Sequence, residues 1–138
     1  MHFRLIDKVI ERGDDRLVAI KQVSLSEEYL QDHFPTFPVL PGVLMLEAMV
    51  QAARELADPE DRANPPLVLA SVRALKYGKF VTPGSTIRVT VQRKSAPGET
   101  PVDCKGTVEI VGEEGGVAAS GRIGLRPAVV PTAADAGR

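Results

Sequence analysis

Apolar and polar residues alternate along most of the chain, in short runs that turn-forming sequences separate. The clearest run is TIRVTVQRK, in which Ile87, Val89 and Val91 fall on one face of a strand. Runs of this kind, bounded by Gly, Pro, Asp and Ser clusters, predict strands over residues 3–11, 17–25, 67–81, 85–94, 102–111 and 117–125. Gly78 predicts a bend in the longest of these strands.

One segment breaks the alternation, because residues 43–53 are apolar except at Glu47 and Gln51. Pro41 suits the first position of a helix, where a missing N–H costs nothing. Asp58-Pro59 marks the end of the helix, because a residue that precedes proline avoids the helical conformation. The sequence therefore predicts one long helix over residues 41–57. A helix that is apolar on all sides is expected to be buried, so we expect an antiparallel sheet to wrap around it.

The order of the expected elements is two strands, a helix and a further run of strands, which indicates an α+β fold. A short helical turn over residues 26–31 is expected before the long helix. The 138 residues suffice for one domain with one core, and we expect that domain to occupy residues 1–126. Residues 127–138 are rich in Ala, Pro and Gly and are expected to form a flexible C-terminal tail.

Charge and metal-binding residues argue against two classes of function. The net charge is -1 and the basic side chains are scattered, so no nucleic-acid partner is expected. Cys104 is the only cysteine, and His2 and His33 are the only histidines. We therefore expect no intrachain disulfide and no metal site.

Hydropathy argues against membrane insertion and export. The apolar run over residues 39–49 is interrupted by Pro, Gly and Glu and is too short to span a bilayer. The first ten residues carry charges at Arg4, Asp7 and Lys8, which a signal peptide does not. The sequence thus favours a cytoplasmic protein.

The two polar residues of the apolar helix are candidates for chemistry. A carboxylate in a buried helix either finds hydrogen-bond donors or holds its proton, and a carboxyl that holds its proton is a general acid. Gln51 lies four residues after Glu47, on the same helix face, and can orient it. Two structural alternatives are open: Glu47 faces solvent at a gap in the sheet, or it pairs with an arginine across a dimer interface.

The residues before this helix add two further functional groups. The free N–H groups of Gly42 and Val43 at the helix N-terminus, with the helix dipole, form a binding site for a carbonyl oxygen. His33 lies upstream in a proline-rich loop, and a histidine titrates near neutrality and can accept a proton. A single loop histidine is often ordinary surface. Taken together, the groups suggest proton abstraction beside a carbonyl, followed by loss of a leaving group.

The stretch HFPTFPVLPGVLMLEAMVQAA, residues 33–53, resembles the active-site segment of the beta-hydroxyacyl-[acyl-carrier-protein] dehydratases of fatty acid synthesis. The resemblance extends to RLIDKVIE at residues 4–11 and VRALKYGKFVTPGS at residues 72–85. The matching positions within the segment are His33-Phe34-Pro35, Pro38, Pro41-Gly42-Val43-Leu44, Glu47 and Gln51. The chain departs from the family at Asp32 and Thr36, where glycine is usual, and at Ser85, where the turn usually ends in Asp.

The resemblance implies the hot-dog fold, a curved antiparallel sheet wrapped around one long central helix. It also implies a homodimer whose two sheets join edge to edge, and trimers of dimers occur among the relatives. Active sites in this family lie at the dimer interface, with the histidine from one subunit and the acid from the other.

The resemblance further implies a role for each residue. His33 removes the C2 proton of a (3R)-3-hydroxyacyl thioester, and Glu47 binds or protonates the 3-hydroxyl so that it leaves as water. The N–H of Gly42, beside Val43 at the helix end, polarises the thioester carbonyl, and Gln51 supports Glu47. The product is a trans-2-enoyl thioester. No metal or redox cofactor is implied, because the thioester supplies the acidity of the C2 proton. The substrate is carried on the 4′-phosphopantetheine arm of an acyl carrier protein or on coenzyme A.

Two other functions are compatible with these residues. An acyl-thioester hydrolase on the same fold would use the carboxylate and the helix end but would not need the histidine. A non-catalytic protein of lipid or polyketide synthesis would bind an acidic acyl carrier without turnover. The basic residues available for such binding, which are also typical of solvated strand edges, are Arg73, Lys76, Lys79, Arg88, Arg93 and Lys94.

Overall fold

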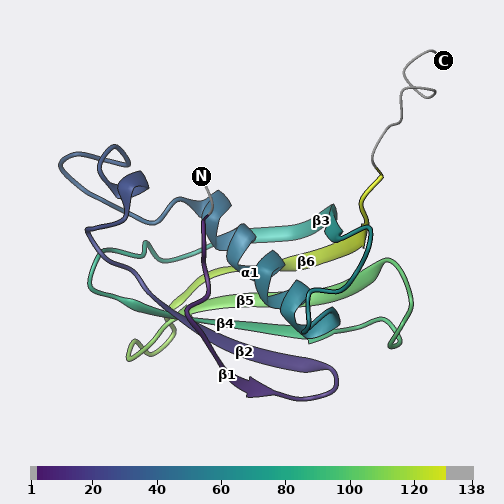
Figure 1. Cartoon of the computed structure of the whole chain (residues 1–138). Coiled ribbons are helices and arrows are strands. Elements are labelled where there is room, and N and C mark those ends of the chain that lie inside the picture. Colours follow the sequence, from purple (N-terminus) through teal and green to yellow (C-terminus); the bar gives the residue numbers. More distant parts are fainter. Residues whose placement is uncertain (1–2, 130–138) are drawn as a thin grey trace, which may run out of the picture.

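A computed structural model describes residues 3–129, which form an antiparallel sheet with one long helix against one of its faces (Figure 1). The strands occur in the sheet order β1-β2-β4-β5-β6-β3, so β1 and β3 are its edges. This confirms the α+β class. The elements are β1 (Lys8–Arg12), β2 (Arg16–Gln22), η1 (Glu28–Leu30, a 3-10 helix), α1 (Gly42–Ala57), β3 (Leu67–Tyr77), β4 (Thr86–Arg93), β5 (Val102–Ile110) and β6 (Val117–Pro127).

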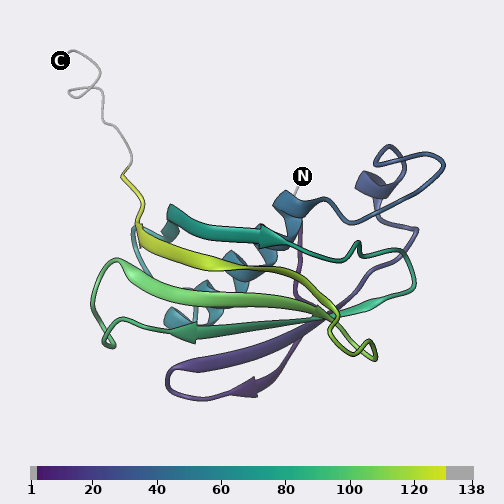
Figure 2. The ribbon, with the colours of Figure 1, turned by 180° about the vertical axis from the view of Figure 1, so that it is seen from behind.

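The core lies between α1 and the sheet. Ile87, Val89 and Val91, which the alternation placed on one face of a strand, are all 0% exposed in β4, and α1 packs against that strand. Met49 and Ala53 of α1 are also fully buried. Burial of each such large aliphatic side chain contributes on the order of 1.5–3 kcal/mol to the hydrophobic stabilisation. Within residues 3–129, no helix covers the opposite face of the sheet (Figure 2).

The prediction that α1 is buried on all sides was wrong for the single chain. Val43 is 68% exposed, and Leu44, Leu46 and Glu47 are only partly buried. The sheet is a single layer, so within one chain it covers one side of α1 and leaves these residues on the other. The apolar face of α1 that the sheet does not reach therefore remains available to another surface.

The predicted first strand is shorter than expected, because β1 begins only at Lys8. The preceding residues Phe3–Leu5, called here the N-terminal strap, run across α1 instead (Figure 1). The side chain of Gln51 explains this path. Its Nε2 donates to the carbonyl oxygen of Phe3 and its Oε1 accepts from the N–H of Leu5, both at 2.8 Å. The strap thus forms backbone hydrogen bonds to a helix side chain rather than to a neighbouring strand.

β3 ends at Tyr77, directly before Gly78, and a backbone bend follows at Lys79, close to the predicted position. A Cβ at Gly78 would collide with the carbonyl oxygen of Val117, so a residue with a side chain does not fit. At the other end of the chain, β6 continues to Pro127, beyond the predicted domain boundary. Most of the predicted tail, residues 130–138, lies outside the described residues, and the tail stays a prediction.

Cys104 lies in β5 with its side chain turned into the core, and it is 0% exposed. Burial raises the pKa of the Cys104 thiol to about 11, because the thiolate would be charged in an apolar environment. The thiol therefore serves as a small hydrophobic side chain. Between residues 3 and 129, no helix has the length and hydrophobicity needed to cross a bilayer.

Candidate active site

His33 is held in a closed loop by hydrogen bonds between its own groups and Val39. The N–H of Val39 donates to the carbonyl oxygen of His33 at 2.8 Å, and His33 Nδ1 lies 3.0 Å from the carbonyl oxygen of Val39. Because a carbonyl oxygen only accepts, Nδ1 carries the hydrogen in this bond. In the neutral ring the lone pair is then on Nε2, which is the tautomer that a general base requires. The imidazole also stacks on Phe34, with ring centroids 4.3 Å apart.

The N-terminus of α1 is fixed to the sheet next to this loop. The N–H of Leu40 donates to the carbonyl oxygen of Val81 at 2.8 Å, which ties the entry of the helix to the segment after β3. Within the helix, Leu44 and Met45 donate to the carbonyl oxygen of Pro41. The N–H groups at the first two helical positions, Gly42 and Val43, have no acceptor in the helix itself.

Tyr77, at the end of β3, lies against this helix end. A Cβ added at Gly42 would stand 2.7 Å from Tyr77 Cζ and 3.1 Å from its hydroxyl oxygen, so the ring covers the α-carbon of Gly42 closely. Nothing in the local sequence indicates this contact, since 34 residues separate the tyrosine from the glycine. Gly42 is thus required for the approach of the Tyr77 ring, in addition to any approach of a substrate.

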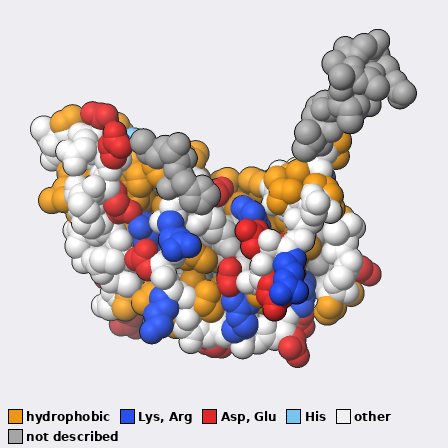
Figure 3. Space-filling view, in the orientation of Figure 1, with side chains coloured by type: hydrophobic (Ala, Val, Ile, Leu, Met, Phe, Trp, Pro, Cys, Tyr) orange, Lys and Arg blue, Asp and Glu red, His pale blue; other side chains and the backbone are white. Residues whose placement is uncertain are grey.

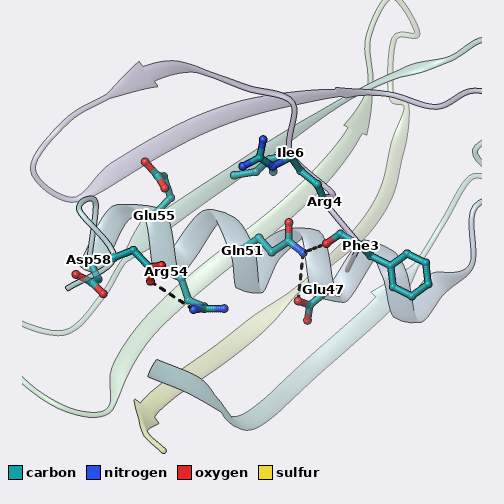
Figure 4. Close-up of a pocket in the computed structure, with 9 residues that line it drawn as sticks. Phe3, Arg4, Ile6, Glu47, Gln51, Arg54, Glu55 and Asp58 are labelled. Carbon is teal, nitrogen blue, oxygen red and sulfur yellow. Dashed lines mark hydrogen bonds and ion pairs between the residues drawn. The ribbon is translucent and has the colours of Figure 1, made fainter. Parts of the chain in front are cut away.

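Glu47 and Gln51 lie together on the face of α1 that the sheet leaves open (Figure 4). Gln51 Nε2 donates to Glu47 Oε1 at 3.3 Å and more strongly to the strap. Both side chains line a cavity of about 540 Å³ between the strap and the C-terminal half of α1. The other residues around it are largely charged, and the full lining is Phe3, Arg4, Ile6, Glu47, Gln51, Arg54, Glu55, Asp58 and Asp61.

The structure brings some of the predicted site residues together and leaves others apart. Val43, Glu47 and Gln51 share one helix face at four-residue spacing. His33 does not line the cavity at Glu47, and no hydrogen bond or ion pair joins the two side chains within residues 3–129. In a single chain, the candidate base and the candidate acid are therefore not bonded to each other and do not line the same cavity.

The basic residues considered for carrier binding are partly engaged within the chain. Arg93 pairs with Asp15 at 3.1 Å, and its side chain is only 11% exposed. Arg73 pairs with Asp103, and Lys79 with Glu113, each at 3.5 Å. Basic and acidic side chains are interspersed over the face that carries α1 (Figure 3). Three of the six residues are thus partners of nearby carboxylates.

Replacement of Gly42 by alanine should lower turnover of a thioester substrate about tenfold or more, with little loss of stability. The added methyl must displace the end of the half-exposed Tyr77 ring. The methyl and the displaced ring then lie beside the free N–H groups and obstruct the carbonyl oxygen of the substrate. Alanine is the better helix former, which offsets part of the strain. Steady-state kinetics and thermal unfolding would measure the two effects. Gly13→Ala is the matched control, because its new Cβ would meet no atom closer than 3.7 Å; wild-type turnover of Gly42→Ala would contradict the placement of the carbonyl site.

An antiparallel sheet that curves over one long helix defines the class of hot-dog-fold proteins, and solved structures of that class superpose on this chain. One is the dehydratase heterocomplex ApeI:P from Xenorhabdus doucetiae, with a TM-score of 0.66 over 86% of this chain and 96% of that one, at 18% identity. At this identity the superposition demonstrates the fold alone.

Sequence comparison identifies the family. Residues 9–114 match the model of the ApeI-like family, described as ApeI dehydratase. The 3-hydroxyacyl-[acyl-carrier-protein] dehydratase FabZ of Streptococcus pneumoniae strain Hungary19A-6 is 37% identical over 126 residues, which cover 86% of this chain and 83% of that protein. The FabZ of Lactococcus lactis subsp. cremoris strain SK11 is 48% identical over 88 residues, which cover 62% of this chain and 60% of the relative. The chain belongs to the ApeI-like family of hot-dog dehydratases, whose relatives include 3-hydroxyacyl-[acyl-carrier-protein] dehydratases.

Proposed function

We propose that this protein is a 3-hydroxyacyl-[acyl-carrier-protein] dehydratase of fatty acid synthesis that acts in the cytoplasm. The observation that supports this most directly is the 3.0 Å contact between His33 Nδ1 and the carbonyl oxygen of Val39, because a hydrogen bond donated by Nδ1 leaves Nε2 free to accept a proton. The N-terminus of α1 adds unpaired N–H groups, and Glu47 adds a carboxyl on the same helix. Two of the relatives that are similar in sequence carry the dehydratase name.

The proposed reaction proceeds as follows. His33 Nε2 removes the proton from C2 of the 3-hydroxyacyl thioester while the N–H of Gly42 stabilises the charge that develops on the carbonyl oxygen. The electron pair from C2 forms the C2–C3 double bond, and the C3–O bond breaks. Glu47 donates the proton with which the 3-hydroxyl leaves as water. The thioester itself makes the C2 proton acidic, so the step as written needs only these groups of the protein.

We propose that the complete site forms in a homodimer, with His33 from one subunit and Glu47 from the other. The separation of the two residues within one chain supports this arrangement. The edge strand β3 is eleven residues long and exposes Leu69 and Val72, and its outer edge is free to pair with a second chain within the described part of the protein. Pairing of two β3 strands would join the sheets edge to edge. It would also bring a second surface towards the uncovered face of α1.

The substrate arrives on an acyl carrier protein or on coenzyme A in this proposal. The direct test is to incubate the purified protein with crotonyl thioesters of both carriers and with 3-hydroxyacyl carrier proteins of several chain lengths. Mass spectrometry would detect gain or loss of one water, and a thiol reagent would detect a released carrier thiol in parallel. We expect interconversion of hydroxyacyl and enoyl thioesters without thiol release.

The other outcomes of this test are equally informative. Thiol release without exchange of water would identify an acyl-thioester hydrolase and refute the dehydratase proposal. Carrier binding without either reaction would identify a non-catalytic binding protein. The internal ion pairs of Arg73, Lys79 and Arg93 leave fewer basic groups for binding a carrier, and they do not bear on hydrolysis.

A further inference from the structure

The N-terminal strap contacts both parts of the candidate site. On one side, Gln51 holds the backbone of Phe3 and Leu5 by two hydrogen bonds of 2.8 Å, while the same amide nitrogen also reaches Glu47 at 3.3 Å. Leu5 is 1% exposed, so its side chain anchors the strap in the core. Figure 4 shows the strap, Gln51 and Glu47 connected in this order. The position of the Glu47 side chain thus depends on the position of the strap.

On the other side, the strap contacts the segment that leads to His33. The ring of Phe3 lies edge-on against the ring of Tyr29, with centroids 5.7 Å apart and planes at 77°. An edge-to-face aromatic pair contributes about 0.5–1.5 kcal/mol beyond its buried area. Tyr29 belongs to η1, which ends at Leu30, three residues before His33. Leu30 is 1% exposed, so η1 is itself fixed in the core.

A largely buried ion pair holds Glu27, the residue directly before η1, to β2 of the sheet. The Tyr29 hydroxyl donates to Glu27 Oε1 at 2.5 Å, and Lys21 Nζ of β2 lies 2.6 Å from the same oxygen. Lys21 is only 5% exposed. Burial alone would raise the pKa of Glu27, but hydrogen bonds from Lys21, Tyr29 and the Ser24 N–H outweigh it and hold the pKa below its usual value. Glu27 therefore stays charged at neutral pH, and the pair remains intact there.

We propose that the strap is a positioning element for the reaction: in each chain Gln51 joins Glu47 to the strap, and Phe3 and Tyr29 join the His33 segment to the same strap. In the proposed homodimer these two groups of one chain serve different sites, so each strap positions the acid of one site and the base of the other. The role in the reaction rests on the proposed dehydratase function, whereas the mechanical coupling does not. Gln51, Phe3 and Tyr29 are positioning residues in this proposal, because none of them needs to touch the substrate.

Hydrogen exchange tests the coupling without any substrate. The N–H of Leu5 reports on the strap, and the N–H of Val39, which donates to the His33 carbonyl, reports on the His33 segment. In Phe3→Ala the amide of Val39 should exchange about fivefold faster, because the ring contact with Tyr29 is lost. The side chain of Phe3 is 38% exposed, so this variant should still fold. Ile10→Ala is the matched control, since it removes a 47% exposed apolar side chain from β1.

Kinetics tests the consequence for the reaction. Phe3→Ala and Gln51→Leu should each lower kcat about tenfold and leave KM within about twofold. Displacement of the acid Glu47 weakens an interaction made in the transition state and leaves binding of the substrate unchanged. Their effects should not add in the double variant, because both act through the strap. Tyr29→Leu should resemble Phe3→Ala, whereas Tyr29→Phe, which retains the ring, should keep most of the activity.

The two tests separate failure of this proposal from failure of the proposed function. If Val39 exchanges at the wild-type rate in Phe3→Ala, the coupling is absent and the proposal is overturned, whatever the protein catalyses. Faster exchange at Val39 together with unchanged kcat in an active enzyme would overturn the positioning role. Absence of dehydratase turnover in the wild type, with faster exchange in the variant, would refute the function and leave only the coupling.

Discussion

His33→Ala and Glu47→Gln should each reduce the hydration of a crotonyl thioester by at least about a hundredfold, because each removes a proton-transfer group and general acid–base catalysis contributes on the order of 10²–10⁴-fold. Glutamine keeps the size of Glu47 and an oxygen that can accept from Gln51, so the surroundings of the acid should be retained. The measurement is steady-state turnover on carrier-protein and coenzyme A substrates, with the dimer verified by size-exclusion chromatography.

Two controls separate lost chemistry from lost structure. His33→Asn places an amide nitrogen where it can still donate to the Val39 carbonyl, but it has no basic ring nitrogen, so it should be as inactive as His33→Ala. Glu55→Gln changes a second carboxylate that lines the same cavity, and it should retain most of the turnover. Activity of His33→Asn near the wild-type level would remove the histidine from the mechanism.

Mixing the two inactive proteins should restore activity. If each site takes His33 from one subunit and Glu47 from the other, a mixed dimer of His33→Ala and Glu47→Gln chains has one intact site and one site that lacks both groups. Random exchange of subunits makes half of the dimers mixed, so the mixture should recover about one quarter of wild-type turnover. The activity should appear as subunits exchange, which is followed by assaying the mixture over time or after joint unfolding and refolding.

The control for this experiment is a chain that carries both substitutions. Mixed with either single variant, the double variant produces dimers in which no site has both groups, so no recovery is expected. Failure of the two single variants to restore turnover after verified subunit exchange would show that each site is built from one chain. The separation of His33 and Glu47 in the single chain would then need a rearrangement on binding.

Most of the fold was predictable from the sequence because the spacing of apolar residues marks which side chains enter the core. Residues of β4 that alternate in the sequence, such as Ile87 and Val89, are fully buried, and the proline at 41 directly precedes the first residue of α1. The turn glycines also separate the strands as expected. The α+β class was therefore accessible from the periodicity, and the hot-dog fold from the resemblance of residues 33–53 to the dehydratase family. The tautomer of His33 was not, because it depends on the carbonyl of Val39 across a loop.

The remaining differences come from contacts between distant residues. The strap was predicted as a strand because Phe3 and Leu5 are apolar, and nothing local revealed that Gln51, more than forty residues later, takes their backbone hydrogen bonds. The contact between Tyr77 and Gly42 was not predictable for the same reason, because the two residues are far apart in the sequence. The apolar composition of α1 predicted burial correctly on the side of the sheet. It could not distinguish burial by the sheet from burial by a second chain.

The buried thiol of Cys104 provides a probe of unfolding within the chain itself. Because its thiolate is rare at neutral pH and its side chain is inaccessible, a thiol reagent should react with the folded protein only through transient opening of β5. The labelling rate would then report the opening free energy of the central sheet, with no engineered cysteine. The same protection means that a thiol released from a substrate can be measured in the presence of the folded enzyme.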